Sequence, residues 1–197
     1  MGRNFEHNKR VFEGFEKQRT GKAICSRDGF IEYQHGMSDV KYDCVTAAYG
    51  GCGAIAAWNV LKFLEKKIDK AVLFDEMEKG TILGGKFGTE VFFVRNYLKR
   101  KGLQVEMHYA LKEFNKVRAE AGIIYYVKDN MKAHYVAFTL AGINERGERL
   151  YRFHNAAAGS YWTTYNNMKF IENLPMTMED FLNESKAKIK VFYDVRK

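Results

Sequence analysis

The alternation of apolar and polar residues divides the chain into a helical first half and a strand-rich second half. Phe5, Phe12 and Phe15 recur on one side of a helix predicted over residues 4–19. The apolar run GFIEYQ predicts a short strand over residues 29–34. We expect residues 1–40 to form an N-terminal arm that packs on the back of the domain.

A second helix is predicted from Cys52 to about Lys66. Its apolar face consists of Ala57, Val60, Leu61 and Leu64, and its polar stripe consists of Asn59, Lys62 and Lys66. Alanine and aliphatic residues fill the first two turns, so we expect the start of this helix to be buried. The pattern therefore predicts a central core helix with Cys52 at its N-terminus.

The remaining pattern moves from helix to antiparallel strands. A helix is predicted between Thr89, as N-cap, and Gly102, which follows its last turn. After it we expect a strand over 103–109, a short helix over 112–120, a strand over 123–127, hairpin strands over 133–142 and 149–156, a helix over 177–185 and a strand over 188–195. Asn144 and Gly147 suit the hairpin turn, and Thr177 with Asp180 resembles a capping box. This order predicts an α+β fold.

Composition favours one soluble domain over residues 1–197. The chain is 46% hydrophobic and 28% charged, and it has a single proline, Pro175, and no low-complexity linker. A net charge of +8 raises the possibility of nucleic-acid binding, but acidic residues are interspersed throughout, so we regard that role as unlikely. No apolar run has the length of a membrane span. We expect a cytoplasmic protein, and the sequence leaves its oligomeric state open.

Three cysteines, Cys25, Cys44 and Cys52, make a disulfide framework or a zinc site improbable, because they form no CxxC pair. Cys52 is flanked by glycines and begins a helix, where unbonded N–H groups favour a thiolate. We therefore interpret Cys52 as a nucleophile, against the alternative of a small buried apolar residue. Cys25 and Cys44 are interpreted as structural.

A nucleophilic thiol requires a general base, and His134 is the preferred choice. The predicted hairpin brings His134 close to residues 155–158, so that Asn155 can orient the imidazole ring. A one-residue slip or a bulge would present His154 instead. His7, His35 and His108 receive no role, and His35 and His108 are interpreted as surface residues.

These segments resemble a family, the double-glycine leader peptidase-like (bacteriocin-processing) members of the papain-like cysteine proteases. CGAIAAWNVL resembles its nucleophile helix, HYVAF its base-bearing strand and YRFHNAAAG the strand that ends in the orienting residue. The resemblance implies a bacterial, papain-like fold with a catalytic core over residues 42–195, in which the central helix packs on an antiparallel sheet. It implies the triad Cys52, His134 and Asn155, with no cofactor or metal. At the position of the family's oxyanion glutamine this chain has Thr46.

The expected function is hydrolysis of a peptide or isopeptide bond in a peptide or protein substrate, through a thioester intermediate. Two alternatives stay open: acyl transfer of the transglutaminase type, and a catalytically inactive peptide-binding module. Three aromatic residues after Asn155 either line the substrate groove or pack a loop onto the core: Tyr161, Trp162 and Tyr165.

Overall fold

The fold is organised around one large sheet. The computed structural model describes residues 2–17, 24–109, 118–127, 133–158, 169–170, 174–185 and 188–197. All neighbouring strands of this five-stranded sheet are antiparallel, and their order across the sheet is β3 (Gln104–Tyr109), β9 (Lys188–Arg196), β4 (Ala121–Val127), β5 (Ala133–Ile143) and β6 (Arg149–His154). The fold is α+β, as the sequence predicts.

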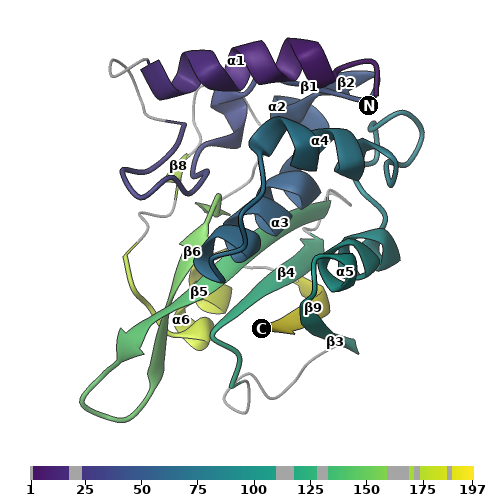
Figure 1. The fold of residues 1–197 in the computed structure, drawn as a ribbon. Helices are drawn as coiled ribbons and strands as arrows, with labels where there is room; N and C mark the ends of the chain where they lie inside the picture. The colour runs from purple at the N-terminus through teal and green to yellow at the C-terminus, as the bar shows by residue number, and fades with distance from the viewer. Residues whose placement is uncertain are drawn as a thin grey trace.

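Helices cover both faces of this sheet, as Figure 1 shows. Helices α3 (Cys52–Phe63) and α5 (Val91–Arg100) lie on one face, and α6 (Met178–Ser185) lies on the other. Helices α1 (Phe5–Lys17) and α4 (Lys70–Glu78) pack together beyond α3, with the Phe12 and Phe74 rings 5.3 Å apart. The short elements are the 3-10 turn η1 (Gln34–Gly36), β1 (Lys41–Tyr42), β2 (Val45–Thr46), α2 (Ala47–Gly50), β7 (Ala157–Ala158) and β8 (Lys169–Phe170).

Each face of the sheet has its own apolar core, because successive strand side chains point to opposite faces. Tyr135 and Ala137 of β5 pack towards α3. Val136 and Phe138 face the other way, in the cluster that contains Phe181 of α6. Burial on both faces explains why the central strands are almost continuously apolar.

Several predicted boundaries are confirmed. The central helix begins at Cys52, and Gly102, just after α5, has the left-handed φ of +77° that suits glycine there. At the start of α6 the Asp180 N–H donates to the Thr177 hydroxyl (3.1 Å), which donates to the Asp180 carboxylate (2.7 Å). The residues singled out for the hairpin turn do close it, since the Gly147 N–H donates to the Asn144 carbonyl at 2.9 Å.

The strand predicted over residues 29–34 is wrong. Only an isolated bridge from Ile31 to Cys25 forms there, and Gln34 begins the η1 turn. The main-chain groups of Ile31 are bonded instead to the amide of Asn59, whose Oδ1 accepts from the Ile31 N–H (2.8 Å) and whose Nδ2 donates to its carbonyl (2.9 Å). Asn59, expected on the polar stripe of the central helix, is therefore buried.

The start of α5 and the region before it also differ from prediction. Glu90, not Thr89, is the N-cap, and its carboxylate accepts from the N–H groups of Phe92 and Phe93. The Thr89 hydroxyl lies 2.6 Å from that of Tyr42 in the interior, so it is not available as a cap. The sequence pattern does not predict α4. Residues 112–117 of the predicted short helix lie outside the described residues, as do Tyr161, Trp162 and Tyr165.

None of the helices in the described part of the chain has the length and apolar character needed to cross a membrane.

Candidate active site

Cys52 lies where a tight turn passes into the central helix. Helix α2 ends at Gly50, Gly51 is the N-cap of α3, and Cys52 is the first residue of α3. The loop after α4 crosses close to this turn: a Cβ on Gly50 would lie 2.4 Å from the Gly85 carbonyl oxygen. Glycine at position 50 is thus required by close packing beside the cysteine.

The sulfur of Cys52 has main-chain N–H groups around it but little solvent. The residue is only 7% exposed, and this burial raises the pKa of the Cys52 thiol. Hydrogen bonds from the backbone N–H groups of Tyr135, Gly53 and Cys52 itself lower that pKa, by less than burial raises it. Two of these donors belong to the start of α3, and the third belongs to β5. The thiol is therefore held between the helix N-terminus and the β5 strand.

His134 directly precedes that β5 donor. Its Nε2 lies 2.9 Å from the main-chain carbonyl oxygen of Asn155, and the imidazole is buried. A carbonyl can only accept, so Nε2 carries the proton and donates it. In the neutral ring Nδ1 is then the acceptor, which is the nitrogen that a general base needs.

Asn155 reaches His134 through its main chain and not through its side chain. Strand β6 ends at His154, and Asn155 adopts a left-handed φ of +59° that turns its carbonyl towards the imidazole. Its side-chain amide, to which sequence reasoning assigned the orienting role, instead bonds to Gln34. The structure thus brings Asn155 and His134 together, with a different atom in contact.

His154, the competing base, lies in a different network. Its Nδ1 is 2.7 Å from Glu32 Oε1, its Nε2 is 2.9 Å from the Thr139 hydroxyl, and its ring stacks on Phe30 at 4.3 Å. The register explains this placement, because His154 pairs with Ala137 and so faces the side opposite to Phe138. Both ring nitrogens of His154 are engaged in hydrogen bonds.

Gln34 is the site residue that sequence reasoning missed. It is 4% exposed and makes three hydrogen bonds, to both polar atoms of the Asn155 side chain and to the Ala48 carbonyl just before Cys52. The segment around Gln34 therefore belongs to the site and does not pack on the back of the domain. A glutamine beside apolar residues was the only available signal, since its partner lies 121 positions away in the sequence.

The other residues singled out from the sequence are Thr46, Cys44 and Cys25. Thr46 is half-buried and precedes α2 as its N-cap, without a side-chain capping bond. Cys44 is exposed, with its sulfur 3.1 Å from the Arg3 guanidinium, and Cys25 is half-buried. All three cysteines are free thiols.

The Tyr126 side chain lies beside His134. Tyr126 is opposite His134 in the β4 and β5 pairing, and the two rings meet edge to face at 5.7 Å. Within the described part of the chain, the buried Tyr126 hydroxyl has no hydrogen-bond partner.

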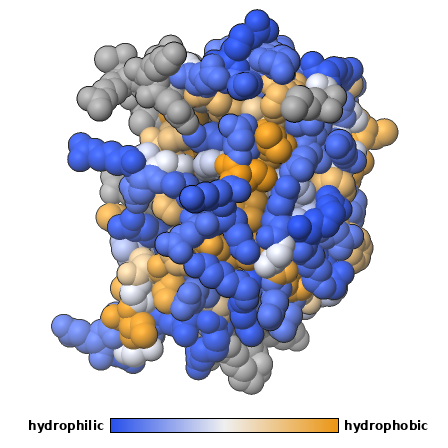
Figure 2. Space-filling view, in the orientation of Figure 1, coloured by the Kyte–Doolittle hydropathy of each residue, from blue (hydrophilic) through white to orange (hydrophobic). Residues whose placement is uncertain are grey.

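Exposed apolar side chains project from the loop after α4, which packs on the end of α2. Leu83 is 70% exposed and Phe87 is 69% exposed, and nearby Tyr49 in α2 is 54% exposed. Figure 2 shows apolar surface among the polar residues, including an area at the upper right margin, where this loop runs in Figure 1.

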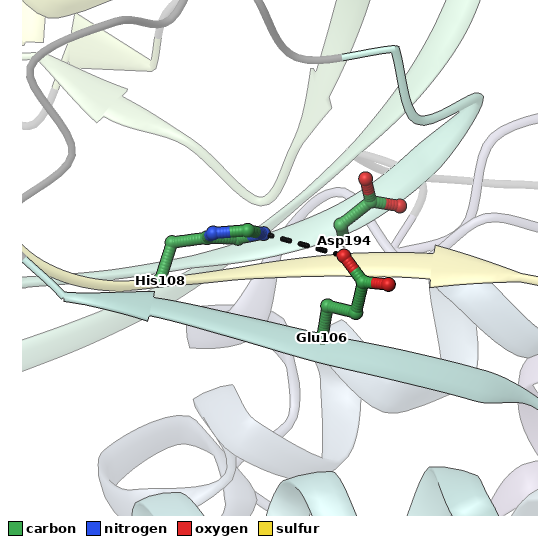
Figure 3. Close-up of side chains that lie close together, drawn as sticks. All are labelled: Glu106, His108 and Asp194. Carbon is green, nitrogen blue, oxygen red and sulfur yellow. Dashed lines mark ion pairs between the residues drawn. The ribbon is translucent and has the colours of Figure 1, made fainter.

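One group of side chains in the described residues has the composition of a cation site. Figure 3 shows Glu106 and His108 on β3 converging with Asp194 on β9, and ligand atoms of the three lie within 4.8 Å of one another. However, the Arg196 guanidinium donates to both Asp194 oxygens, at 3.1 and 2.7 Å. Arg196 neutralises this carboxylate and would compete with a cation. His108, interpreted as plain surface, is in fact half-buried against the Phe192 ring.

Neither a protein-family model nor a curated protein sequence matches the chain. Among solved structures, it is similar to the peptidase domain of Streptococcus ComA, a bifunctional ABC transporter involved in a quorum-sensing pathway (14% identity, 73% of this chain and 89% of that one, TM-score 0.47). It is also similar to a double glycine motif protease from an AMS/PCAT transporter, solved with the leader peptide (14%, 73% and 82%, TM-score 0.46). The peptidase domain of Streptococcus mutans ComA gives 11% identity, 75% and 93% coverage and a TM-score of 0.40. Similarity this low assigns no activity to this chain.

Proposed function

We propose that this chain is a cysteine peptidase in which Cys52 is the nucleophile, His134 is the general base and the main-chain carbonyl of Asn155 orients the imidazole. The observation that carries this proposal is the hydrogen bond from His134 Nε2 to the Asn155 carbonyl. His134 is the residue before Tyr135, whose backbone N–H lowers the pKa of the Cys52 thiol. A cysteine at a helix start, a histidine and a fixed acceptor behind the histidine are the three parts that thiol catalysis requires.

The proposed reaction begins with a neutral thiol, because burial raises the pKa of Cys52. Nδ1 of His134 removes the thiol proton as the sulfur attacks the substrate carbonyl carbon. The tetrahedral intermediate collapses to a thioester, and His134 returns the proton to the leaving amine. His134 then takes a proton from water, which attacks the thioester and releases the acid and the Cys52 thiol.

The negative oxygen of the tetrahedral intermediate requires donors. We assign one donor to the main-chain N–H of Cys52, at the start of α3. The hydroxyl of Thr46 remains the proposed side-chain donor, since it precedes α2 and has no capping bond of its own.

A peptide is the proposed substrate class. Leu83 and Phe87 give the loop beside the nucleophile helix apolar surface that peptide side chains can cover. Nothing in the proposed reaction calls for a cofactor, since every proton moves between side chains, substrate and water.

A second candidate function is that of a peptide-binding module without catalysis, and one observation favours it. Cys52 is only 7% exposed and its pKa is raised, which describes a poorly reactive thiol. In that function the polar contacts of His134 and Asn155 would serve only to satisfy buried groups.

Acylation of the sulfur distinguishes the two functions. The protein is incubated at neutral pH with an activated ester of a short blocked peptide, and the adduct is located by intact mass and peptide mapping. A peptidase forms a transient thioester on Cys52 that is absent in Cys52→Ala, at least tenfold slower in His134→Ala and unchanged in the matched control Cys44→Ser. Absence of an adduct on Cys52, or equally slow adducts on Cys44 and Cys52, would favour the binding module.

A further inference from the structure

We infer that Gln34 is a positioning residue of the proposed active site, which holds Asn155 so that its main-chain carbonyl faces His134. The inference rests on the proposed peptidase function and adds a residue outside the Cys52, His134 and Asn155 set. Gln34 acts on Asn155, and it does not touch the reacting atoms.

The contact between Gln34 and Asn155 is reciprocal. The Gln34 main-chain N–H donates to Asn155 Oδ1 at 3.0 Å, and Asn155 Nδ2 donates to Gln34 Oε1 at 2.9 Å. Both residues are buried, at 4% and 1% exposure. Two directed bonds between buried groups fix the side-chain amide in place, because an alternative orientation would leave polar atoms without partners.

The third bond of Gln34 ties this pair to the nucleophile. Gln34 Nε2 donates to the carbonyl of Ala48 at 3.2 Å, and Ala48 belongs to the short helix α2 that ends just before Cys52. Gln34 thus links the residue that orients the base with the turn that carries the thiol. One of the two N–H donors of Gln34 Nε2 is engaged at the Ala48 carbonyl.

Asn155 needs such a support because of its backbone conformation. Its φ is +59°, a left-handed value that few residues other than glycine adopt, and it follows directly after the end of β6. The main-chain N–H of Asn155 has a contact to Glu32 Oε2 at 3.3 Å. Gln34 holds the side chain of Asn155, and the Asn155 carbonyl accepts a hydrogen bond from His134. These bonds fix the orientation of the polar groups of Asn155.

Gln34→Met tests the inference, since it keeps the volume of the side chain and removes its two hydrogen bonds. We expect kcat for peptide hydrolysis to fall about tenfold to a hundredfold, the loss associated with a misplaced catalytic group, while KM stays within twofold. Gln34→Glu keeps an acceptor for Asn155 Nδ2 but loses the donor to the Ala48 carbonyl, so we expect it to recover only the part of kcat that depends on the bond to Asn155. This second variant also serves if the methionine variant does not fold.

Asn59 provides a matched control. Asn59→Leu removes a buried amide that also makes two hydrogen bonds to the segment before α2, but to Ile31 and not to Asn155. We expect it to lower the melting temperature as Gln34→Met does, and to leave kcat within twofold. Equal losses of kcat in the two variants would overturn the inference.

A double-mutant cycle tests whether Gln34 acts through Asn155. Asn155→Gly removes the amide and still allows the left-handed backbone. In that background Gln34→Met should change kcat less than twofold, because its partner is already gone. Losses that multiply would show that the two residues act independently, and would also overturn the inference.

A nuclear magnetic resonance readout separates failure of this inference from failure of the proposed function. The Nε2–H proton of His134, assigned by comparison with His134→Ala, should be protected from exchange in the wild type and in Asn59→Leu, and exposed in Gln34→Met. This pattern in a protein without peptidase activity would uphold the positioning role and refute the function. If the wild type is an active enzyme but the His134 Nε2–H proton stays protected from exchange in Gln34→Met, the positioning role is refuted.

Discussion

Gly50 lies so close to the loop after α4 that we expect an alanine at this position to destabilise the protein. In Gly50→Ala the new methyl would lie 2.4 Å from the Gly85 carbonyl oxygen and 3.1 Å from a Val45 methyl. Ordinary contact begins at 3.4 Å, so the loop or α2 must shift by about 1 Å. The loop cannot yield freely, since Ile82 and Gly88 are hydrogen bonded within it and Gly84 accepts from the Cys44 N–H.

The expected cost follows from two opposing effects. Overpacking against a main-chain atom lowers the free energy of unfolding by about 3 kcal/mol, and replacing glycine by alanine in a helix raises it by about 0.5–1 kcal/mol. The net loss of about 2 kcal/mol corresponds to a melting temperature lowered by roughly 4–8 °C in a chain of this size. Because the displaced loop packs two residues from Cys52, we also expect slower acylation of the thiol.

Differential scanning calorimetry and the acylation assay measure both effects. The matched control is Gly14→Ala, in α1, where a methyl would meet nothing within 4 Å. It should raise stability by about 0.5–1 kcal/mol and leave acylation unchanged. A Gly50→Ala protein as stable as the wild type would show that the approach of Gly85 to α2 is not the constraint described.

Three further predictions concern the core. Burial raises the pKa of Tyr42, Tyr126 and Tyr193, so the folded protein keeps protons that the unfolded chain loses above about pH 10. Stability should be full below that pH and fall above it by about 1.4 kcal/mol per pH unit for each such tyrosine, as melting temperatures between pH 8 and 11 would show. Tyr126→Phe removes a buried hydroxyl that lacks a partner in the described part of the chain, and should raise stability by about 1–2 kcal/mol; a lower melting temperature would contradict this. Gly122→Ala would place a methyl 2.2 Å from the Tyr193 carbonyl and 2.3 Å from the Phe138 ring, so we expect no soluble folded protein; native circular dichroism in this variant would contradict the packing.

The sequence predicted those parts of the site that depend on local pattern. A glycine-flanked cysteine before an apolar helical pattern placed Cys52 at the start of α3, and a turn signal at Asn144 and Gly147 placed His134 on a hairpin strand. These features follow from backbone preferences of neighbouring residues, which a single sequence contains.

The parts that the sequence did not predict depend on contacts between distant residues. Gln34 and Asn155 are 121 positions apart in the sequence, and no periodic pattern of residues predicts that they are in contact. The carbonyl of Asn155 replaced its amide as the contact to His134 because of one left-handed φ at the end of β6. Likewise, Asn59 has the polarity of a surface residue, but it is buried by its bonds to Ile31.

The place of the last strand in the sheet order could not be predicted from the sequence either. The sequence predicts a strand over residues 188–195, but alternation alone cannot show that β9 is inserted between β3 and β4. That order is set by packing on both faces, with Phe192 on the α6 side and Tyr193 on the α3 side.

The alkylation rate of Cys52 is the most direct test of whether His134 takes the proton of the Cys52 thiol. Wild type and His134→Ala are treated with iodoacetamide at pH 7, and modification of Cys52 and Cys44 is followed separately by peptide mapping. We expect Cys52 to react at least tenfold faster in the wild type than in His134→Ala, while Cys44 reacts equally in both. Equal rates for Cys52 in the two proteins would contradict this role of His134.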